Sequence, residues 1–255
     1  MAIFKITSLA NPEIRKVRAL REKKYRIQQQ QCIAEGIRAC STLLQNSQLA
    51  ALYVIENYLD QAHTLITRYI SSEATPLIRQ VSDSVMKKIS TSTTPSGILG
   101  VFNIPQQPDK ITLTSGIVLA DITDPGNMGT LIRSAAAMSV KTVVIIGGTD
   151  CWAPKVIQAS AGTIGLVNIL TITWQELLQY KKDQKLYALV VSGGAPASAI
   201  NRDNALLVIG NEAHGLTEAQ IHNCDYTISL TMPGKTESLN AAVAGSIALY
   251  LTFAQ

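Results

Sequence analysis

Five short apolar runs, separated by helical or turn-rich stretches, constrain the second half of this chain more than any other feature. They cover Gly116–Asp121, Thr142–Ile146, Leu186–Val191, Ala205–Ile209 and Tyr226–Leu230. Aliphatic and β-branched runs of this length that alternate with helices are typical of a parallel sheet covered by helices on both faces. The helices expected between and after the runs span 129–138, 154–160, 174–181, 217–223 and 239–253. The pattern predicts an α/β fold.

The first 105 residues carry a smaller α/β pattern. Helices are expected at 35–45, 61–70 and 83–90, and strands at 51–56, 77–81 and 98–102. The stretch Ile104–Lys110 then combines two prolines with no apolar periodicity, as linkers do. We therefore expect an N-terminal domain over residues 1–105, a linker over 106–112 and a second domain over 113–255.

The positive charge is concentrated in the N-terminal part. Residues 1–105 contain 13 Lys and Arg against 7 Asp and Glu, whereas the remainder contains 9 against 11. Next to the helical apolar spacing of Ile14, Val17 and Leu20 lies a cluster of cations: Arg15, Lys16, Arg18, Arg21, Lys23, Lys24 and Arg26. Such a cluster is either a solvated helix face or a surface that contacts nucleic-acid phosphates.

Several classes of protein are disfavoured. The apolar runs stop at five or six residues, far short of the roughly 20 needed for a membrane span. The start of the chain lacks the apolar region of an export signal, so we expect a cytoplasmic protein with no membrane partner. Four cysteines and three histidines show no zinc-ligand spacing and no CxxC pair, so no metal is expected. The absence of a Gly-x-Ser-x-Gly turn disfavours hydrolase chemistry.

Three polar segments lie beside the predicted strands, and ligands of open α/β sheets bind at the carboxyl ends of strands. The first contains Asn127, Gly129 and Arg133, at the start of a helix. It has neither the dinucleotide-binding glycine pattern nor that of a P-loop. Arg133 alone could equally be an ordinary surface arginine.

The second and third segments are Gly210-Asn211-Glu212, after a strand, and Ser238-Leu239-Asn240, before the last helix. A solvated loop acid would account for Glu212, and Ser238 occupies the expected N-cap position. Neither explanation covers Asn240, which is a poor helix former for a first turn.

Taken together, the order and spacing of the three segments resemble the motifs of SpoU-class RNA 2′-O-ribose methyltransferases of the SPOUT superfamily. Asn127-x-Gly129 followed by three residues and Arg133 matches the first motif, and the other two segments match the second and third. The resemblance covers residues 116–255. Over the first 105 residues, Lys16–Arg26, Ala34–Gly36 and Pro95–Ile98 resemble the N-terminal RNA-binding domain that many members carry.

The resemblance implies a parallel sheet whose C-terminal part forms a trefoil knot, and a homodimer with its site at the subunit interface. It further implies S-adenosylmethionine as cofactor, bound in the knot by Gly210, Asn211, Leu230, Met232 and Leu239. Members usually have a proline where this chain has Thr231, which restores an N–H and makes the cofactor loop less rigid.

For catalysis, the resemblance points to Arg133, Asn127, Glu212, Ser238 and Asn240. Arg133 would act as base or activator of the ribose hydroxyl, with Asn127 positioning it or the ribose. Since a guanidinium remains protonated in proteins, Arg133 could instead clamp a phosphate and stabilise the developing oxyanion.

The expected substrate is a guanosine of 23S ribosomal RNA, because a separate N-terminal RNA domain favours ribosomal over transfer RNA. Three alternatives stay open: a transfer-RNA ribose methyltransferase, a paralogue that binds RNA without turnover, and an NAD-dependent oxidoreductase. The missing dinucleotide fingerprint disfavours the last.

Overall fold

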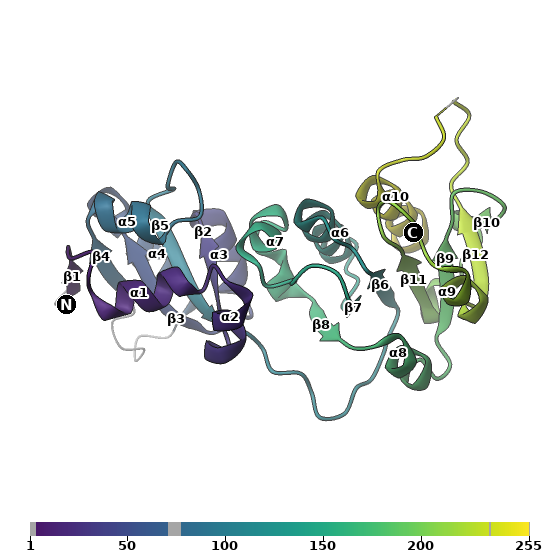
Figure 1. Ribbon diagram of the computed structural model, residues 1–255, viewed down its shortest axis with the longest axis horizontal. Coiled ribbons are helices and arrows are strands. Elements are labelled where there is room, and N and C mark those ends of the chain that lie inside the picture. The colour runs from purple at the N-terminus through teal and green to yellow at the C-terminus, as the bar shows by residue number, and fades with distance from the viewer. Residues whose placement is uncertain (1–3, 71–77, 235, 255) are drawn as a thin grey trace. The chain divides into compact units, whose positions relative to one another are not determined.

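The computed structural model describes residues 4–70, 78–234 and 236–254. The chain divides into two compact units (Figure 1). One comprises Met1–Gln106 with the segment Trp152–Leu166, and the other comprises Gln107–Cys151 with Val167–Gln255. The first unit is therefore built from two stretches of the chain that lie far apart in sequence. The domain boundaries predicted at residues 105 and 113 remain predictions.

The first unit contains a five-stranded mixed sheet in the order β1-β4-β3-β5-β2. Its strands are β1 (Phe4–Ile6), β2 (Gln31–Glu35), β3 (Leu49–Val54), β4 (Ile78–Val81) and β5 (Ile98–Asn103). Its α-helices are α1 (Pro12–Ala19), α2 (Lys23–Gln29), α3 (Ile37–Leu43), α4 (Leu59–Tyr69), α5 (Asp83–Ile89) and α7 (Pro154–Ala159). Strands β1, β4 and β3 are parallel, whereas β5 is antiparallel to both β3 and β2.

Most elements predicted in the first 105 residues are confirmed to within about two residues, although Leu77 of one predicted strand lies outside the described residues. The helix predicted at 35–45 begins two residues later than predicted, and a strand that was not predicted precedes it. Residues Gln31–Glu35 form strand β2, and the helix begins only at Ile37. Gly36 separates the two elements with a φ of 87°, a conformation that glycine adopts without steric cost.

The cation cluster at 15–26 is divided by the fold. It spans two helices rather than one, because Glu22 between α1 and α2 has an extended backbone. Arg26 is buried and donates to the carbonyl oxygens of Leu20 and Arg21, each at 2.8 Å. Arg21 donates to the carbonyl of Lys88 at 3.0 Å. These two arginines therefore stabilise the fold, whereas Arg15, Lys16, Arg18, Lys23 and Lys24 are exposed.

The second unit contains a seven-stranded sheet in the order β10-β12-β9-β11-β6-β7-β8, with every described pairing parallel. Its strands are β6 (Gly116–Ala120), β7 (Thr142–Ile146), β8 (Asn168–Thr171), β9 (Lys185–Leu189), β10 (Ala195–Pro196), β11 (Ala205–Ile209) and β12 (Tyr226–Ser229). The predicted parallel α/β architecture is confirmed, although β8 and β10 were not predicted.

Helices cover both faces of this sheet. They are α6 (Pro125–Ala137), α8 (Trp174–Tyr180), α9 (Glu218–Asn223) and α10 (Ala241–Phe253). Alternate residues of the central strands, such as Val118 and Val208, form one core with Leu177 of α8. Helices α6 and α10 pack together on the opposite face. Within the described residues, no helix is long and apolar enough to cross a lipid bilayer.

Two helices that frame the site begin elsewhere than predicted. Helix α6 starts at Pro125, four residues before the predicted start, because Asp124 caps it by accepting from the Asn127 N–H at 2.8 Å. A proline at the first helical position fits, since its missing N–H has no partner there in any case. Helix α10 starts at Ala241, two residues later than predicted.

Candidate active site at the switch point of the parallel sheet

The order of the parallel sheet changes direction between β6 and β11. From β6 the chain continues through β7 and β8 on one side, whereas β11, β9 and β12 lie on the other. The chain therefore leaves the carboxyl ends of β6 and β11 in opposite directions along the sheet. Open α/β sheets bind their ligands at such a point. The loops that follow β6 and β11 are joined here by the Asn211 side chain, whose Nδ2 donates to the carbonyl oxygen of Asp121 at 2.8 Å.

The Glu212 carboxylate ties the β11 loop to the start of α6. Its Oε2 accepts from the backbone N–H of Thr123 at 3.1 Å and from the Thr123 hydroxyl at 2.9 Å. Its Oε1 accepts from the backbone N–H of Asp124 at 3.0 Å and from the Asn127 side chain at 3.1 Å. A carboxylate at a helix N-terminus is also stabilised by the helix dipole. Glu212 is therefore a fixed anion rather than a solvated loop acid.

These contacts explain the acidity of Glu212. Partial burial raises the pKa of its carboxyl group, but the hydrogen bonds from Asn127, Thr123 and Asp124 outweigh that effect and lower the pKa to about 2. Glu212 is thus ionised throughout the neutral range and is a poor proton acceptor. Its geometry suits it to orient other groups.

Asn127 extends the network to the last helix. Its Oδ1 accepts from Nδ2 of Asn240 at 3.1 Å, while its own Nδ2 donates to Glu212. Three side chains from three separate sequence segments therefore form one chain of hydrogen bonds, Asn240 to Asn127 to Glu212.

The predicted cap of the last helix is corrected by the structure. The N-cap of α10 is Asn240 and not Ser238: the Asn240 Oδ1 accepts from the N–H groups of Ala242 and Val243 at 2.9 and 3.2 Å. A side-chain oxygen at this position satisfies helix donors that have no partner within the helix. Asn240 thus uses its oxygen for the helix and its NH₂ group for Asn127, whereas Ser238 lies before the helix, in the wall of the adjacent pocket.

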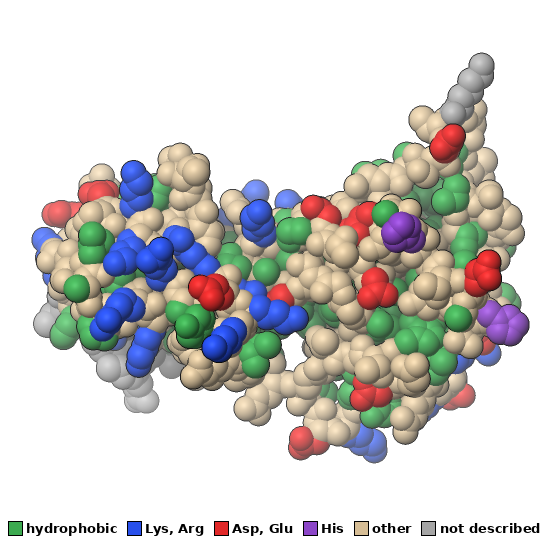
Figure 2. All heavy atoms as spheres, viewed as in Figure 1, with side chains coloured by type: hydrophobic (Ala, Val, Ile, Leu, Met, Phe, Trp, Pro, Cys, Tyr) green, Lys and Arg blue, Asp and Glu red, His purple; other side chains and the backbone are tan. Residues whose placement is uncertain are grey.

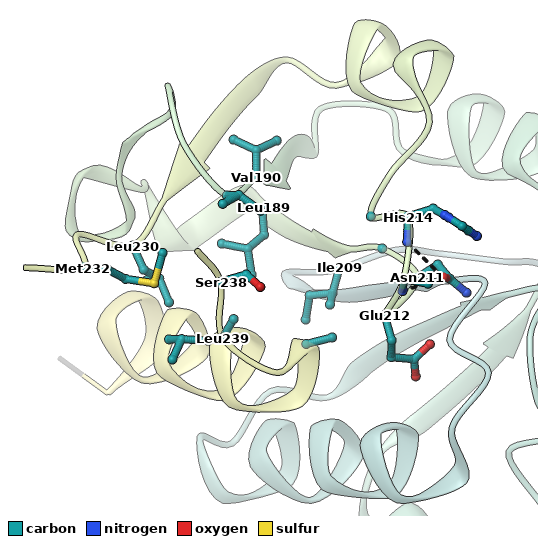
Figure 3. Close-up of a pocket in the computed structure, with 16 residues that line it drawn as sticks. Leu189, Val190, Ile209, Asn211, Glu212, His214, Leu230, Met232, Ser238 and Leu239 are labelled. Carbon is teal, nitrogen blue, oxygen red and sulfur yellow. Dashed lines mark hydrogen bonds between the residues drawn. The ribbon is translucent and has the colours of Figure 1, made fainter. Parts of the chain in front are cut away.

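A pocket of about 300 Å³ lies next to this network. Its walls come from the segments that follow three adjacent strands, β9, β11 and β12, and from the start of α10 (Figure 3). The lining comprises Leu189, Val190, Val191, Ile209, Gly210, Asn211, Glu212, Ala213, His214, Gly215, Leu230, Met232, Ser238, Leu239, Ala241 and Ala244. In Figure 3, Leu189, Leu230, Met232, Ser238 and Leu239 gather on one side, and Asn211, Glu212 and His214 on the other.

All five residues predicted to bind the cofactor, Gly210, Asn211, Leu230, Met232 and Leu239, line this pocket. Two of the residues predicted to be catalytic, Glu212 and Ser238, line it as well. Asn127 joins it through its hydrogen bond to Glu212, and Asn240 joins it through its hydrogen bond to Asn127.

Gly210 is required by a close approach within the pocket wall. A Cβ atom at this position would lie 2.4 Å from the carbonyl carbon of Gly215 and 2.5 Å from the backbone nitrogen of Leu216. The loop closes tightly because Asn211 and Gly215 exchange two backbone hydrogen bonds, at 3.1 and 2.9 Å. A side chain at position 210 would force this loop to open.

Arg133 is not brought into the pocket. It lies on α6, six residues beyond Asn127, and its side chain is exposed. At 1.5 Å of rise per residue, six residues place it about 9 Å farther along the helix. Among the described residues of this one chain, the pocket lining does not include Arg133.

Some site residues were not predicted. Thr123 and Asp124 supply three of the donors to Glu212, and the Asp124-Pro125 pair is a helix-start signal that could have identified the cap. Val190, Val191, Ile209 and His214 line the pocket without any distinctive sequence signal. Among the described residues, no group of three or more His, Cys, Asp and Glu side chains is arranged to hold a metal ion.

Models of known protein families match both parts of this chain. Residues 115–250 match the model of the SpoU rRNA Methylase family. This chain belongs to the SpoU rRNA Methylase family. Residues 11–100 match the MRM3-like substrate binding domain. Both of the network's outer residues, Glu212 and Asn240, and the central Asn127 lie within the part matched by the SpoU family model.

Individual SpoU relatives cover large parts of the chain. The 23S rRNA (guanosine(2553)-2′-O)-methyltransferase RlmP of Bacillus subtilis (strain 168) is 29% identical over 175 residues, which span 67% of this chain and 70% of the relative. A solved RNA 2′-O ribose methyltransferase is 28% identical, with a TM-score of 0.82, and the match covers 99% of both chains. An AdoMet-bound rRNA methyltransferase from Sinorhizobium meliloti shares the fold, with a TM-score of 0.83 at 23% identity, over 98% of this chain and 97% of that one. The α/β fold of this SpoU protein is therefore that of solved RNA methyltransferases.

Proposed function

We propose that this protein transfers a methyl group from S-adenosylmethionine to a ribose 2′-hydroxyl of RNA, with a guanosine of 23S ribosomal RNA as the target. The observation that carries the proposal is the Asn240–Asn127–Glu212 network beside a pocket at the switch point of a parallel sheet. The named relative RlmP, a 23S rRNA guanosine 2′-O-methyltransferase, supports the choice of substrate.

The pocket fits the proposed cofactor in size and character. Its volume of about 300 Å³ is at the lower end of the range for small-molecule sites. Leu230, Leu239 and Ile209 supply apolar walls for an adenine ring, and the Gly210 backbone forms part of the same wall. The bound cofactor supplies an electrophilic methyl group on a sulfonium. The apolar side chains of the wall would favour such chemistry, because they exclude water from a site in which a positive charge is lost.

The chain's own residues would orient the ribose and handle the developing charge. Glu212 remains ionised and holds Asn127 in a fixed position, so that Asn127 and Asn240 present oriented amides next to the pocket. Arg133 either takes part in proton removal or holds the adjacent phosphate. A permanently charged guanidinium suits the second role better.

In an assembly of two chains, Arg133 of one chain would reach the pocket of the other. An exposed apolar stripe on α10 supports such an assembly. Val243, Ile247 and Tyr250 follow one another at helical spacing along α10 and are 41% to 61% exposed. Leu239, 38% exposed, continues the stripe into the pocket wall. We include in the proposal a homodimer that buries this stripe and completes the site. The trefoil knot and the cytoplasmic location remain predictions.

The test is a methyl-transfer assay with radiolabelled S-adenosylmethionine and separate 23S ribosomal and transfer-RNA transcripts. We expect labelled 23S RNA that contains one 2′-O-methylated guanosine, with release of S-adenosylhomocysteine. Arg133→Ala should abolish this turnover while cofactor affinity stays within a few fold. Labelled transfer RNA would change the substrate, and RNA binding without release of S-adenosylhomocysteine would identify a non-catalytic paralogue.

A further inference from the structure

The first unit contains a second candidate binding site, a cleft between α1 and α2. The cleft has a volume of about 610 Å³ and is lined by Arg15, Lys16 and Ala19 of α1 and by Tyr25, Gln28 and Gln29 of α2. Figure 2 shows Lys and Arg side chains gathered over the face where these two helices lie. No residue of this cleft contributes to the pocket of the second unit.

The two helices are held in a fixed relation by a buried cation. Arg26, on α2, donates to the carbonyl oxygens of Leu20 and Arg21, which form the turn that joins the helices. Leu20 itself is buried in the core of the unit with Ile14 and Val17 of α1. The cleft is therefore built before any ligand arrives, which lowers the entropic cost of binding.

The lining combines three kinds of group that one nucleotide needs. Arg15 and Lys16 are exposed cations that can hold a phosphate. The half-buried Tyr25 offers an aromatic ring for stacking, and Lys24 adds a further cation, with its Nζ 6.0 Å from the ring centroid. The carboxamides of Gln28 and Gln29 both donate and accept hydrogen bonds, so they can pair with the edge of a base.

We propose that this cleft binds one unpaired nucleotide of the RNA substrate, with its base stacked on Tyr25 and its phosphate held by Arg15 and Lys16. The ligand is single-stranded because a base must leave its helix before it can stack on a side chain. The inference rests on the proposed function, since it concerns how that RNA is recognised. Arg15 and Lys16 thus bind RNA, whereas Arg21 and Arg26 hold the fold.

The test measures binding of a fluorescein-labelled oligoribonucleotide to the full chain by anisotropy over a range of salt concentrations. The oligoribonucleotide is offered single-stranded or annealed to its complement. Tyr25→Ala should weaken single-strand binding about tenfold, as expected for loss of one base stack, while Tyr25→Phe should retain it. Arg15→Gln combined with Lys16→Gln should reduce the salt slope by about 0.7 for each lost phosphate contact.

The control removes two exposed cations elsewhere in the same unit, through Lys5→Gln and Lys87→Gln, and should leave the salt slope unchanged. Equal binding by wild type and Tyr25→Ala, or a preference for the duplex, would overturn the proposal. A second measurement uses the unaltered protein and so does not depend on the folding of the variants. Photo-crosslinking of RNA that contains 4-thiouridine should label Tyr25. Crosslinks confined to other parts of the chain would contradict the proposal. The assay needs no methyl transfer, so failure of the proposed catalysis would be seen separately.

Discussion

Replacement of Glu212 by glutamine tests the central contact of the site. The carboxylate accepts four hydrogen bonds, two at each oxygen. Glutamine keeps one oxygen but turns the other into an NH₂ group that faces two donors, so two charge-assisted bonds are lost. Such bonds contribute about 1.5 to 3 kcal/mol each. Because the site is partly exposed and water can replace a partner, we expect a total loss of about 2 kcal/mol.

The loss should depend on pH in a direction fixed by the pKa of Glu212. That pKa falls from 4.5 to about 2 on folding, so the stabilisation is complete above about 4.5 and disappears as the pH falls towards 2. With these two values, roughly two-fifths of the ionic contribution remains at about pH 3. The difference in stability between wild type and Glu212→Gln should therefore shrink from about 2 kcal/mol at neutral pH to less than about 1 kcal/mol at pH 3.

Urea unfolding followed by circular dichroism at both pH values measures this difference, and thermal unfolding at neutral pH should show a drop of roughly 4 to 8 °C. The matched control is Glu218→Gln, which removes a carboxylate from the exposed first turn of α9 and should cost less than about 1 kcal/mol. An equal gap at both pH values, or a Glu212 variant no less stable than the control, would refute the assignment of Glu212 as a hydrogen-bonded anion.

Three further substitutions address the pocket, the last helix and the proposed dimer. Gly210→Ala places a methyl group against the Gly215 backbone, so titration calorimetry should show S-adenosylmethionine affinity reduced at least tenfold in a chain that still folds; unchanged affinity would argue against a rigid loop. Asn240→Ser keeps an oxygen that can cap α10 but loses the donor to Asn127. Methyl transfer should therefore slow, while the free energy of unfolding changes by less than about 0.5 kcal/mol. Asn240→Ala removes the cap as well and should also lower the free energy of unfolding by about 1 kcal/mol. Ile247→Asp should convert a dimer into a monomer by light scattering after gel filtration, because a charge on the α10 stripe opposes burial; a variant that stays dimeric would place the interface elsewhere.

Regular elements with strong local signals were predictable from the sequence. The strands β6, β7 and β11 match their predicted runs to within one residue, because each is a continuous aliphatic run buried on both faces. Strand β8, Asn168–Thr171, was not predicted: only one of its four residues is buried, so it lacks the apolar signal that the central strands carry. An edge strand forms because it makes hydrogen bonds to the neighbouring strand, and its own composition is a weaker signal.

The three motif segments could be placed at strand ends, but their mutual contacts could not be derived from the sequence. Asn127 and Glu212 are separated by 85 positions and Asn127 and Asn240 by 113, and no periodicity encodes which amide meets which carboxylate. The exchange of roles between Ser238 and Asn240 has the same cause. Both residues are good caps, and the choice depends on where the helix can start when α10 packs against α6.

That packing has an identifiable physical origin at Gly245. A Cβ there would lie 2.5 Å from a methyl carbon of Leu131 on α6 and 2.7 Å from one of Ile209 on β11, so glycine lets α10 sit close to both elements. The contact is reinforced by the Ser134 and Ser246 hydroxyls, 2.7 Å apart. With the body of α10 fixed in this way, its first turn is held next to the first turn of α6, and Asn240 is the residue that meets Asn127. The placement of this network therefore depends on a glycine that lies five residues, more than one helical turn, beyond Asn240. At that position the sequence alone shows only an apolar, alanine-rich helix.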